Sequence, residues 1–500
     1  MKNIAVINAT DLRPPAGRPI LDGASSFQRA MRFALGLPGV DALLILASSS
    51  RVLPHETPPN SRVIERPSWS VADLIAEMEK AGQGFEDIFY FFADCPFLDP
   101  VIASRMHASH RRYWADYTFS DGFPLGLTPE ILTQQTVSRL RGMSTADSGA
   151  PDRETLFAVI RKDINSFDIE TELAPADLRL LRVSLSADTE RNFLLLKRIV
   201  EKGGHDTESI CRVLQEEPKI LRTLPAFFPV QIVEGCPHAC SYCPYPVFAG
   251  DVTRKTGVMD SGQFSSLAQK IAALCGDAVI DISLWGEPAF HPEIFEIMGS
   301  VLRTPGLSLV IETSGVGWDH GLFSRVKGSF ATQPTWIVSL DASTEQMYQR
   351  LRGAGYSEAV RTAETLLSTF PGRTWVQAVR MKENEEDLET FYKFWKTKTE
   401  NIIIQKYDSF SSFLPDRKVA DLSPVRRFPC WHLKRDMAIL IDGTVPLCRE
   451  DVRVEHKLGN AFTEDLGAIW DRGEQAYRQH ITQSYPRICA GCDEYYTYNY

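Results

Sequence analysis

The sequence predicts an α/β protein whose centre is an open, partial (β/α)6 barrel of the TIM type. Between residues 226 and 408, short runs of apolar residues alternate with longer segments of helical periodicity. Strands that alternate with helices pair in parallel through right-handed crossovers. Six strand patterns are present in this region. A closed barrel of the usual kind needs eight, so we expect the sheet to stay open.

The central elements follow one another as strand and then helix. The expected strands are Pro229–Val233, Ala278–Leu284, Leu307–Glu312, Thr335–Leu340, Thr374–Val379 and Ile402–Lys406. The expected helices are Ser261–Cys275, Pro292–Arg303, Gly321–Phe330, Ser343–Phe370 in one or two pieces, and Asn384–Thr399. Serine is a common residue at a helix N-cap, and we expect Ser261 to cap the first of these helices.

Residues 1–200 carry a second α/β pattern. Two buried strands, Ile4–Asn8 and Ala42–Ala47, flank a helix near Phe27–Leu35. A third strand, Ile88–Phe92, leads directly into Asp94, a residue type that binds divalent metals together with phosphate. The polar stretch that follows this region predicts a linker over residues 201–225.

The periodicity weakens after residue 408, which predicts a small C-terminal domain over residues 409–500. Ser409–Pro429 is expected to be an irregular connector. Met437–Ile441 and Thr444–Leu447 lie on either side of an Asp-Gly pair, which predicts a β-hairpin. Thr463–Ile481 predicts an amphipathic helix.

The composition is that of a globular protein. Of the 500 residues, 44% are hydrophobic and 24% are charged, which excludes a disordered chain. A net charge of −10 argues against nucleic acid or an anionic membrane as a partner. No apolar run is long enough to cross a bilayer, and residues 1–15 lack the pattern of a signal peptide. We therefore expect a soluble, cytoplasmic protein.

Ten cysteines are present, and most of them are clustered. In an intracellular protein such clusters indicate metal binding rather than disulfides. The isolated residues Cys95, Cys211 and Cys275 are expected to be small buried side chains.

The loop after the first central strand contains Cys236, Cys240 and Cys243. Three thiolates at this spacing can hold three corners of a 4Fe–4S cube and leave one iron without a protein ligand. An open coordination position is the mark of a catalytic rather than a structural metal site. The alternative is a zinc site made of the same cysteines and His238.

A glycine, a proline and several polar residues lie at the ends of the next three central strands. They are Gly286, Glu287 and Pro288, then Thr313 and Ser314, then Ser339 and Asp341. Because the carboxyl ends of parallel strands share one rim, we expect these residues and the cysteine loop to form one site. For Ser314 and Asp341 the alternative is local capping of a strand end.

The second cysteine group is Cys430, Cys448, Cys489 and Cys492. Four thiolates complete one closed metal site, so we expect one fully ligated cluster, with a zinc ribbon as the alternative. A closed cluster cannot bind substrate through its metal. We therefore expect it to transfer an electron or to order the substrate pocket.

The C-x3-C-x2-C spacing, with Tyr242 before the last cysteine, resembles the radical S-adenosylmethionine (radical SAM) superfamily. Trp285-Gly286-Glu287-Pro288 is similar to its Gly-Gly-Glu-Pro motif, with Trp285 in place of the first glycine. The resemblance implies a 4Fe–4S cluster and S-adenosylmethionine as cofactors. It also implies that Gly286 and Glu287 hold the amino group of the cofactor's methionine. The residues at the following strand ends would contact its carboxylate and ribose.

The second cysteine group resembles the SPASM/Twitch extension of such enzymes, in the shorter form with one auxiliary 4Fe–4S cluster. The three-part order of the chain resembles the spiro-SPASM proteins. Residues 1–200 resemble nucleotide-sugar cytidylyltransferases, which implies a nucleotidyltransferase-like domain with Asp94 and Asp188 as ligands of Mg²⁺ beside a nucleotide. The phosphate loop of those enzymes is replaced by a segment with two adjacent prolines, Pro14 and Pro15, which lack amide donors. A degenerate binding or docking domain is therefore favoured over an active transferase.

The resemblance implies an oxidoreductase or maturase that reductively cleaves S-adenosylmethionine to a 5′-deoxyadenosyl radical and abstracts a substrate hydrogen. A peptide or protein side chain is the preferred substrate, with flavodoxin or ferredoxin as electron donor. The alternatives are oxidation of a sugar, aminocyclitol or nucleotide-activated sugar and, from another class, a non-catalytic electron-transfer or scaffold protein.

Overall fold

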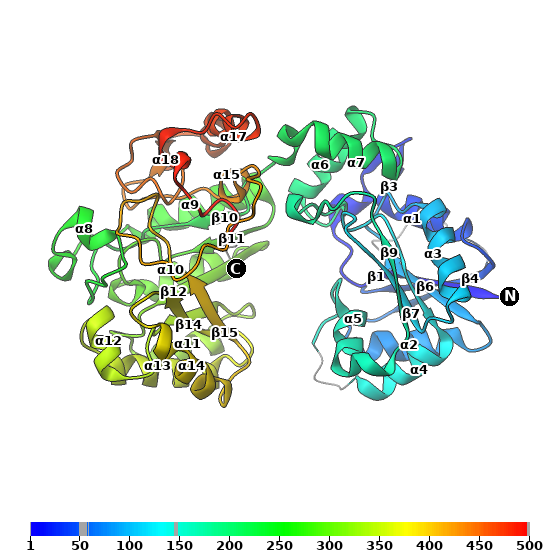
Figure 1. Cartoon of the computed structure of the whole chain (residues 1–500), viewed down its shortest axis with the longest axis horizontal. Coiled ribbons are helices and arrows are strands. Elements are labelled where there is room, and N and C mark those ends of the chain that lie inside the picture. The colour runs from blue at the N-terminus through cyan, green and yellow to red at the C-terminus, as the bar shows by residue number, and fades with distance from the viewer. Residues whose placement is uncertain (1, 50–57, 59, 145–148, 498–500) are drawn as a thin grey trace. The chain divides into compact units, whose positions relative to one another are not determined.

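The computed structural model describes residues 2–49, 58, 60–144 and 149–497. The chain divides into two compact units, Met1–Thr223 and Leu224–Tyr500 (Figure 1). The segment 201–225, expected to be a linker, instead contains helix α7 (Thr207–Glu216) and the short helix η5 (Pro218–Leu221). Its apolar side chains, such as Ile210 and Leu214, pack in a core of the first unit. The finer division of the second unit near residue 408 stays a prediction.

The described part of the first unit is built on a seven-stranded mixed sheet with the order β5-β4-β1-β6-β8-β7-β9. Its strands are β1 Asn3–Ala9, β4 Val40–Ala47, β5 Ser61–Glu65, β6 Asp87–Phe92, β7 Tyr117–Asp121, β8 Glu130–Thr133 and β9 Ile169–Leu173. A small separate ribbon consists of β2 Pro19–Leu21 and β3 Ala24–Ser25. The helices are α1 Ser26–Leu35, α2 Val71–Gly82, α3 Pro100–Arg112, α4 Gln134–Met143, α5 Thr155–Ile160 and α6 Glu190–Glu201, with 3-10 turns at Pro14–Gly17, Arg161–Ser166 and Arg179–Leu181.

The central strands of this sheet are buried on both faces. Ala5 and Ile7 of β1 pack in one core with side chains of α1 and α3. Ile4 and Val6 pack in another core with side chains of α2, α4 and α5. This two-sided burial explains why the strands have continuous apolar sequences rather than alternating ones.

The described part of the second unit contains the predicted open barrel, a six-stranded sheet with the order β10-β11-β12-β13-β14-β15. The strands are β10 Phe227–Pro229, β11 Ala278–Asp281, β12 Leu307–Thr313, β13 Thr335–Ser339, β14 Thr374–Arg380 and β15 Ile402–Lys406. Every neighbouring pair is parallel. The helices that follow β10 to β14 are α8 Tyr245–Ala249, α9 Ser261–Cys275, α10 Ile294–Leu302, α11 His320–Ser329, α12 Glu345–Leu351, α13 Tyr356–Thr369 and α14 Glu385–Lys396, with 3-10 turns at Val252–Arg254 and Pro288–Phe290.

Because all the neighbouring strands of this sheet are parallel, their carboxyl ends lie at one rim, where the site is built. One large core cluster joins the strands to the helices that cover them. The start of α9 differs in detail from the prediction. The cap is Asp260, whose carboxylate accepts a hydrogen bond from the Gln263 amide, and Ser261 is the first helical residue.

The C-terminal part has the predicted hairpin-and-helix character, but its strand pairing differs. β16 (Thr444–Pro446) pairs antiparallel with β17 (Lys457–Asn460). Of the predicted hairpin with residues 437–441 only the turn is present, where the Leu440 amide donates to the Thr444 carbonyl at 2.9 Å. Residues 436–439 run beside β10 instead, through bridges from Phe227 to Asp436 and from Val230 to Ile439. They pair with an edge of the sheet that would otherwise expose unpaired backbone groups.

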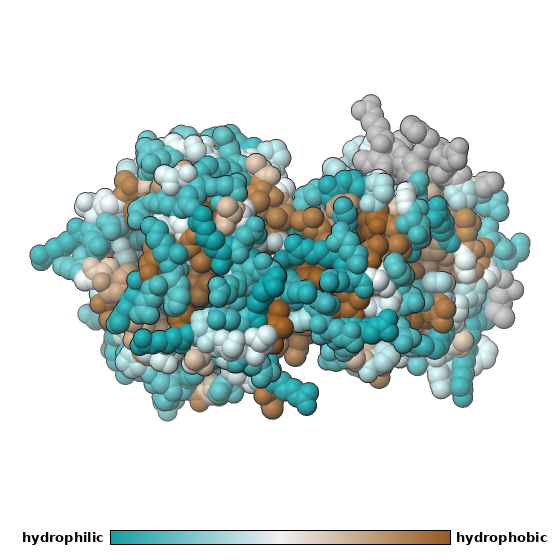
Figure 2. Space-filling model, turned by 90° about the horizontal axis from the view of Figure 1, so that it is seen from above, coloured by the Kyte–Doolittle hydropathy of each residue, from teal (hydrophilic) through white to brown (hydrophobic). Residues whose placement is uncertain are grey.

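The predicted helix 463–481 is divided at Gly473 into α16 (Leu466–Arg472) and α17 (Glu474–Ile481). The remaining helices of this part are α15 Trp431–Arg435 and α18 Arg487–Ala490. Within the described residues, no helix combines the length and apolar character that a membrane span requires. Hydrophilic residues cover most of the face drawn in Figure 2, with apolar residues scattered between them.

Candidate functional site

The three-cysteine loop lies at the carboxyl end of the β10 segment, beside a cavity of about 240 Å³. Cys236, Cys240 and Cys243 all line this cavity, and none of them forms a disulfide. The structure brings most of the predicted site residues to the same cavity. They are Tyr242, Gly286, Glu287, Thr313, Ser314 and Ser339. The shared rim expected from the parallel sheet is therefore present, while the role of each residue stays a prediction.

Gly286 brings the end of the β11 segment close to the cysteine loop. Its φ of 73° belongs to the left-handed region, and a Cβ there would lie 2.2 Å from the Val233 carbonyl oxygen. The next residue, Glu287, donates its amide hydrogen to the Gly235 carbonyl at 2.8 Å. Only glycine permits this close approach, which attaches the second motif to the loop that carries the thiols.

The Glu287 carboxylate binds the end of the neighbouring strand β12. It accepts hydrogen bonds from Thr313 Oγ1 at 2.5 Å and from the Ser314 amide at 2.8 Å. The side chain is buried, and burial raises the pKa of its carboxyl group. Glu287, Thr313 and Ser314 thus form one rigid wall of the cavity. Pro288 begins the short helix that follows and does not line the cavity.

Asp341 was expected to contact the cofactor, but the structure places it behind the cavity wall. Its carboxylate accepts hydrogen bonds from Tyr242 Oη, from Arg352 and, at 2.7 Å, from the Val379 amide. It is fully buried and is absent from the cavity lining, whereas Tyr242 and Arg352 both line it. Asp341 therefore positions two residues that face the cavity.

Arg352 is a site residue that the sequence did not reveal. It follows α12 in a stretch without a recognisable motif, and its side chain is only 6% exposed. A buried guanidinium beside three thiols provides positive charge and donors for a carboxylate. For a zinc site, the alternative considered above, His238 would be the fourth ligand. Its Nε2 lies 2.8 Å from the Ala354 carbonyl oxygen, so this nitrogen is already engaged with the backbone.

The cavity lining also contains a pair of acidic side chains, Asp281 of β11 and Glu312 of β12. Within the described residues, neither has a cation at ion-pair distance, although Arg449 lines the same cavity. Burial and then repulsion from Glu312 raise the pKa of Asp281, and burial raises that of Glu312. These residues occupy strand positions in the sequence, so only the sheet shows that they face the site.

The second cysteine group meets in its own small cavity. Cys430, Cys448, Cys489 and Cys492 all line it. Three buried polar atoms on the same lining have no hydrogen-bond partner among the described residues, namely Arg427 Nε and both ring nitrogens of His480. Buried polar groups are normally paired. Four thiols surrounded by unpaired polar atoms fit a fully ligated iron–sulfur cluster, which offers sulfur acceptors on several sides.

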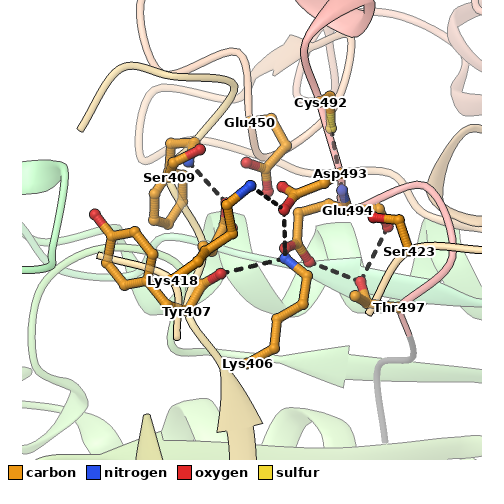
Figure 3. Close-up of polar contacts among 12 residues, drawn as sticks. Lys406, Tyr407, Ser409, Lys418, Ser423, Glu450, Cys492, Asp493, Glu494 and Thr497 are labelled. Atoms are coloured by element: carbon orange, nitrogen blue, oxygen red, sulfur yellow. Dashed lines mark hydrogen bonds and ion pairs between the residues drawn. The ribbon is translucent and has the colours of Figure 1, made fainter. Parts of the chain in front are cut away.

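Charged side chains of β15, of the connector after it and of the C-terminal segment form a network (Figure 3), and some of them line one or both of the cavities. Lys406 of β15 contacts Glu494 and lies 3.4 Å from Asp493, which Lys418 contacts at 2.9 Å. Arg449 lines both cavities. It lies 3.7 Å from both Asp408 and Glu494 and 3.1 Å from Glu450.

The acidic groups of this network are close enough to bind a metal ion. The ligand atoms of Asp408, Asp493 and Glu494 lie within 4.8 Å of one another. Their charge, however, is already balanced by Lys406, Lys418 and Arg449, so the group needs no added cation.

The arrangement of Asp94 and Asp188 in the first unit does not fit the expected Mg²⁺. The Arg153 guanidinium lies 2.6 Å from Asp94 Oδ2 and 3.5 Å from Asp188 Oδ2. Asp188 also accepts a hydrogen bond from Asn192 at 2.7 Å. A permanent cation of the protein therefore bridges the two carboxylates, where a metal ion would have to bind.

Comparison with known proteins identifies two sequence families in the second unit. Residues 230–394 match the model of the Radical SAM superfamily, and residues 430–493 match an iron–sulfur cluster-binding domain, SPASM. An uncharacterized protein of Treponema pallidum (strain Nichols) is 39% identical over 360 residues, which are 69% of this chain and 98% of the relative.

Two solved structures are similar at lower identity. Streptococcus suis SuiB bound to the precursor peptide SuiA is 13% identical with a TM-score of 0.44, covering 73% of this chain and 84% of that one. A cytidylyltransferase from Leptospira borgpetersenii is 16% identical with a TM-score of 0.36, covering 44% of this chain and 96% of that one.

Replacing Asp281 by Asn should stabilise the protein at alkaline pH. The raised pKa of Asp281, about 7, means that the stability linked to its protonated form is present in acid and is lost as the pH rises through that value. We expect the gain in unfolding free energy of Asp281→Asn to be roughly 1–3 kcal/mol larger at pH 8 than at pH 5. Denaturant titration of both proteins at equal iron content measures it. Asp11→Asn, an exposed change, is the control, and an equal difference at both pH values would contradict the prediction.

Replacing Arg153 by Ala should create a metal site in the first unit. Without the guanidinium, Asp94 and Asp188 keep two facing carboxylates and no cation, so Mn²⁺ affinity should rise about tenfold or more. The EPR signal of free Mn²⁺ during titration of the full chain measures this. Arg139→Ala, which removes an exposed ion pair with Asp116, is the control. Tight binding by the unmodified chain that Asp94→Asn abolishes would show that Arg153 does not take the place of a metal.

Proposed function

The chain belongs to the radical SAM superfamily, and from this membership we propose that it removes a hydrogen atom from a side chain of a peptide or protein. It is an enzyme with 4Fe–4S clusters and S-adenosylmethionine as cofactors. When bound, the reduced cluster and S-adenosylmethionine supply the radical that abstracts hydrogen. The non-catalytic alternative is set aside, since the superfamily consists of enzymes.

Cys236, Cys240 and Cys243 are the residues proposed to hold the catalytic cluster. Three ligands leave one position for S-adenosylmethionine, as the open cavity beside them allows. Arg352 supplies a buried cation for the cofactor's carboxylate, and Asp341 keeps it in place. The Gly286 turn and the Glu287 wall fix the opposite side, so that the site is rigid before the cofactor binds.

The observation that carries the peptide proposal is the aromatic rim of the cavity. Trp285 stacks on Tyr245 with ring centroids 6.1 Å apart and contacts Phe248 and Phe410. Trp285, Tyr245 and Phe410 line the cavity. Next to them, outside the lining, lie Phe248, 37% exposed, and its neighbour Val247, 64% exposed. An apolar, partly exposed rim suits a peptide chain lying across it, because aromatic side chains supply most of the contact energy in peptide and protein interfaces.

The polar part of the same cavity lining favours a second candidate, oxidation of a sugar, aminocyclitol or nucleotide-activated sugar. Several charged and amide groups belong to this lining, namely those of Asp281, Glu312, Gln377, Lys406 and Arg449. Such a density of donors and acceptors suits a small polyol as well as one polar side chain. In either case we propose flavodoxin or ferredoxin as the electron donor.

The first test is cleavage of S-adenosylmethionine by the reconstituted full chain under a strong reductant. We expect 5′-deoxyadenosine by mass spectrometry, and we expect its loss in Cys243→Ala. Substrates with deuterium at candidate carbons, offered as peptides and as nucleotide sugars, should then transfer deuterium into 5′-deoxyadenosine. Absence of cleavage would refute the proposed enzymatic reaction. Deuterium transfer only from sugars would show that the substrate is a sugar and not a peptide.

Replacing Gly286 by Ala should weaken S-adenosylmethionine binding. The added Cβ collides with the Val233 carbonyl and disfavours the left-handed backbone, which should move the motif away from the cysteine loop. We expect affinity to fall about tenfold or more, which corresponds to about 1.4 kcal/mol. Isothermal titration at equal iron content measures it. Gly328→Ala in α11, where a Cβ meets no atom within 4 Å, should bind as the parent does, and parental affinity of the Gly286 variant would contradict the assignment.

A further inference from the structure

Two histidines line the four-cysteine cavity, and their hydrogen bonding differs completely. His432 is paired on both sides, with Nδ1 2.6 Å from Asp436 Oδ2 and Nε2 3.0 Å from Thr497 Oγ1. His480 of α17 is 2% exposed, and neither of its ring nitrogens has a partner among the described residues. The imidazole ring is packed edge-on against Tyr485, with ring centroids 5.0 Å apart.

An imidazole carries at least one N–H in either tautomer, and a buried N–H without an acceptor is unfavourable. The protein does not supply the acceptor for His480. Glu450 Oε2 is an acceptor on the same cavity, but it does not accept a hydrogen bond from His480. None of the four cysteine sulfurs accepts a hydrogen bond from His480 either, so the remaining candidate is a sulfur of the cluster that they would hold.

We propose that a ring N–H of His480 donates a hydrogen bond to a sulfur of the cluster held by Cys430, Cys448, Cys489 and Cys492, and so raises its reduction potential. The inference rests on the proposed function only in taking these four thiolates as ligands of a 4Fe–4S cluster. The four cysteines complete the ligand set, so His480 is a donor to sulfur and not a fifth ligand. A donor stabilises the more negative, reduced form of a cluster.

The surroundings of His480 point in the same direction. Arg427 lies on the same lining and donates to the Cys489 carbonyl at 2.6 Å, while its own Nε has no partner among the described residues. Its guanidinium carbon lies 4.1 Å from the centroid of the Tyr485 ring that supports His480. One face of the cavity thus presents N–H donors and positive charge, both of which favour an added electron.

The experiment uses the full chain with Cys236, Cys240 and Cys243 all changed to Ala, so that only the auxiliary cluster is present. His480→Phe removes the donor and keeps a ring, whereas His480→Asn keeps an N–H. Tyr485→Phe is the matched control, because it keeps the ring against His480 and changes no group on the cavity lining. Iron content and EPR-monitored potentiometry are measured for each protein.

We expect about four irons per chain in every variant. At a fixed applied potential, the ratio of reduced to oxidised cluster should fall about tenfold in His480→Phe, equal to about 59 mV for a one-electron couple. His480→Asn should recover most of this loss, and Tyr485→Phe should match the parent. Parental potentials in His480→Phe with the cluster intact would overturn the proposal.

Pulsed EPR on the parent labelled with ¹⁵N-histidine decides the matter even where His480→Phe takes up no iron. A weak coupling from a non-coordinating imidazole nitrogen, lost in His480→Asn, supports the hydrogen bond. No coupling, or the strong coupling of a directly bound nitrogen, overturns it. Zinc or no metal in the triple-cysteine parent would instead refute the auxiliary cluster itself, which separates failure of the proposed function from failure of the His480 assignment.

Discussion

The buried carboxylate of Asp341 is the interaction on which the geometry of the site depends. It joins Tyr242 of the cysteine loop, Arg352 after α12 and the amide of Val379 in β14. Its own backbone carbonyl accepts a hydrogen bond from Asn384 at 2.9 Å. Segments far apart in the chain are thereby held at one rim of the sheet. A buried ion pair of this kind adds little net stability, but the loss of one partner leaves a buried charge uncompensated, so the arrangement is specific.

One charged network contributes side chains to both cysteine-lined cavities of the second unit. Arg449 directly follows Cys448 and faces both cavities, while Lys406 and Asp408 come from the end of the barrel sheet. Any change of charge in one cavity is therefore felt in the other, because buried charges are weakly screened. This arrangement gives a physical basis for communication between the substrate cavity and the auxiliary site.

The fold of the first unit does not depend on its polar site. The turn after β6 carries Asp94 and the loop before α6 carries Asp188, and the two carboxylates lie together, as the metal prediction required. Arg153 bridges them with a guanidinium. The sheet and its two cores are built instead from apolar side chains on the opposite faces of the strands.

Local patterns in the sequence were sufficient for the open parallel barrel and for the three-cysteine loop. Strand-helix alternation specifies parallel pairing, and ligands close in sequence must be close in space. The meeting of Cys430 and Cys448 with Cys489 and Cys492 was predicted instead from the number of ligands and from the SPASM/Twitch resemblance. Local patterns were insufficient for Arg352, for the Asp281–Glu312 pair, for the pairing of residues 436–439 with β10 and for the unpaired His480. Each of these depends on which distant side chains or strands become neighbours. That choice is made by packing across the folded sheet, so only the tertiary structure could decide it.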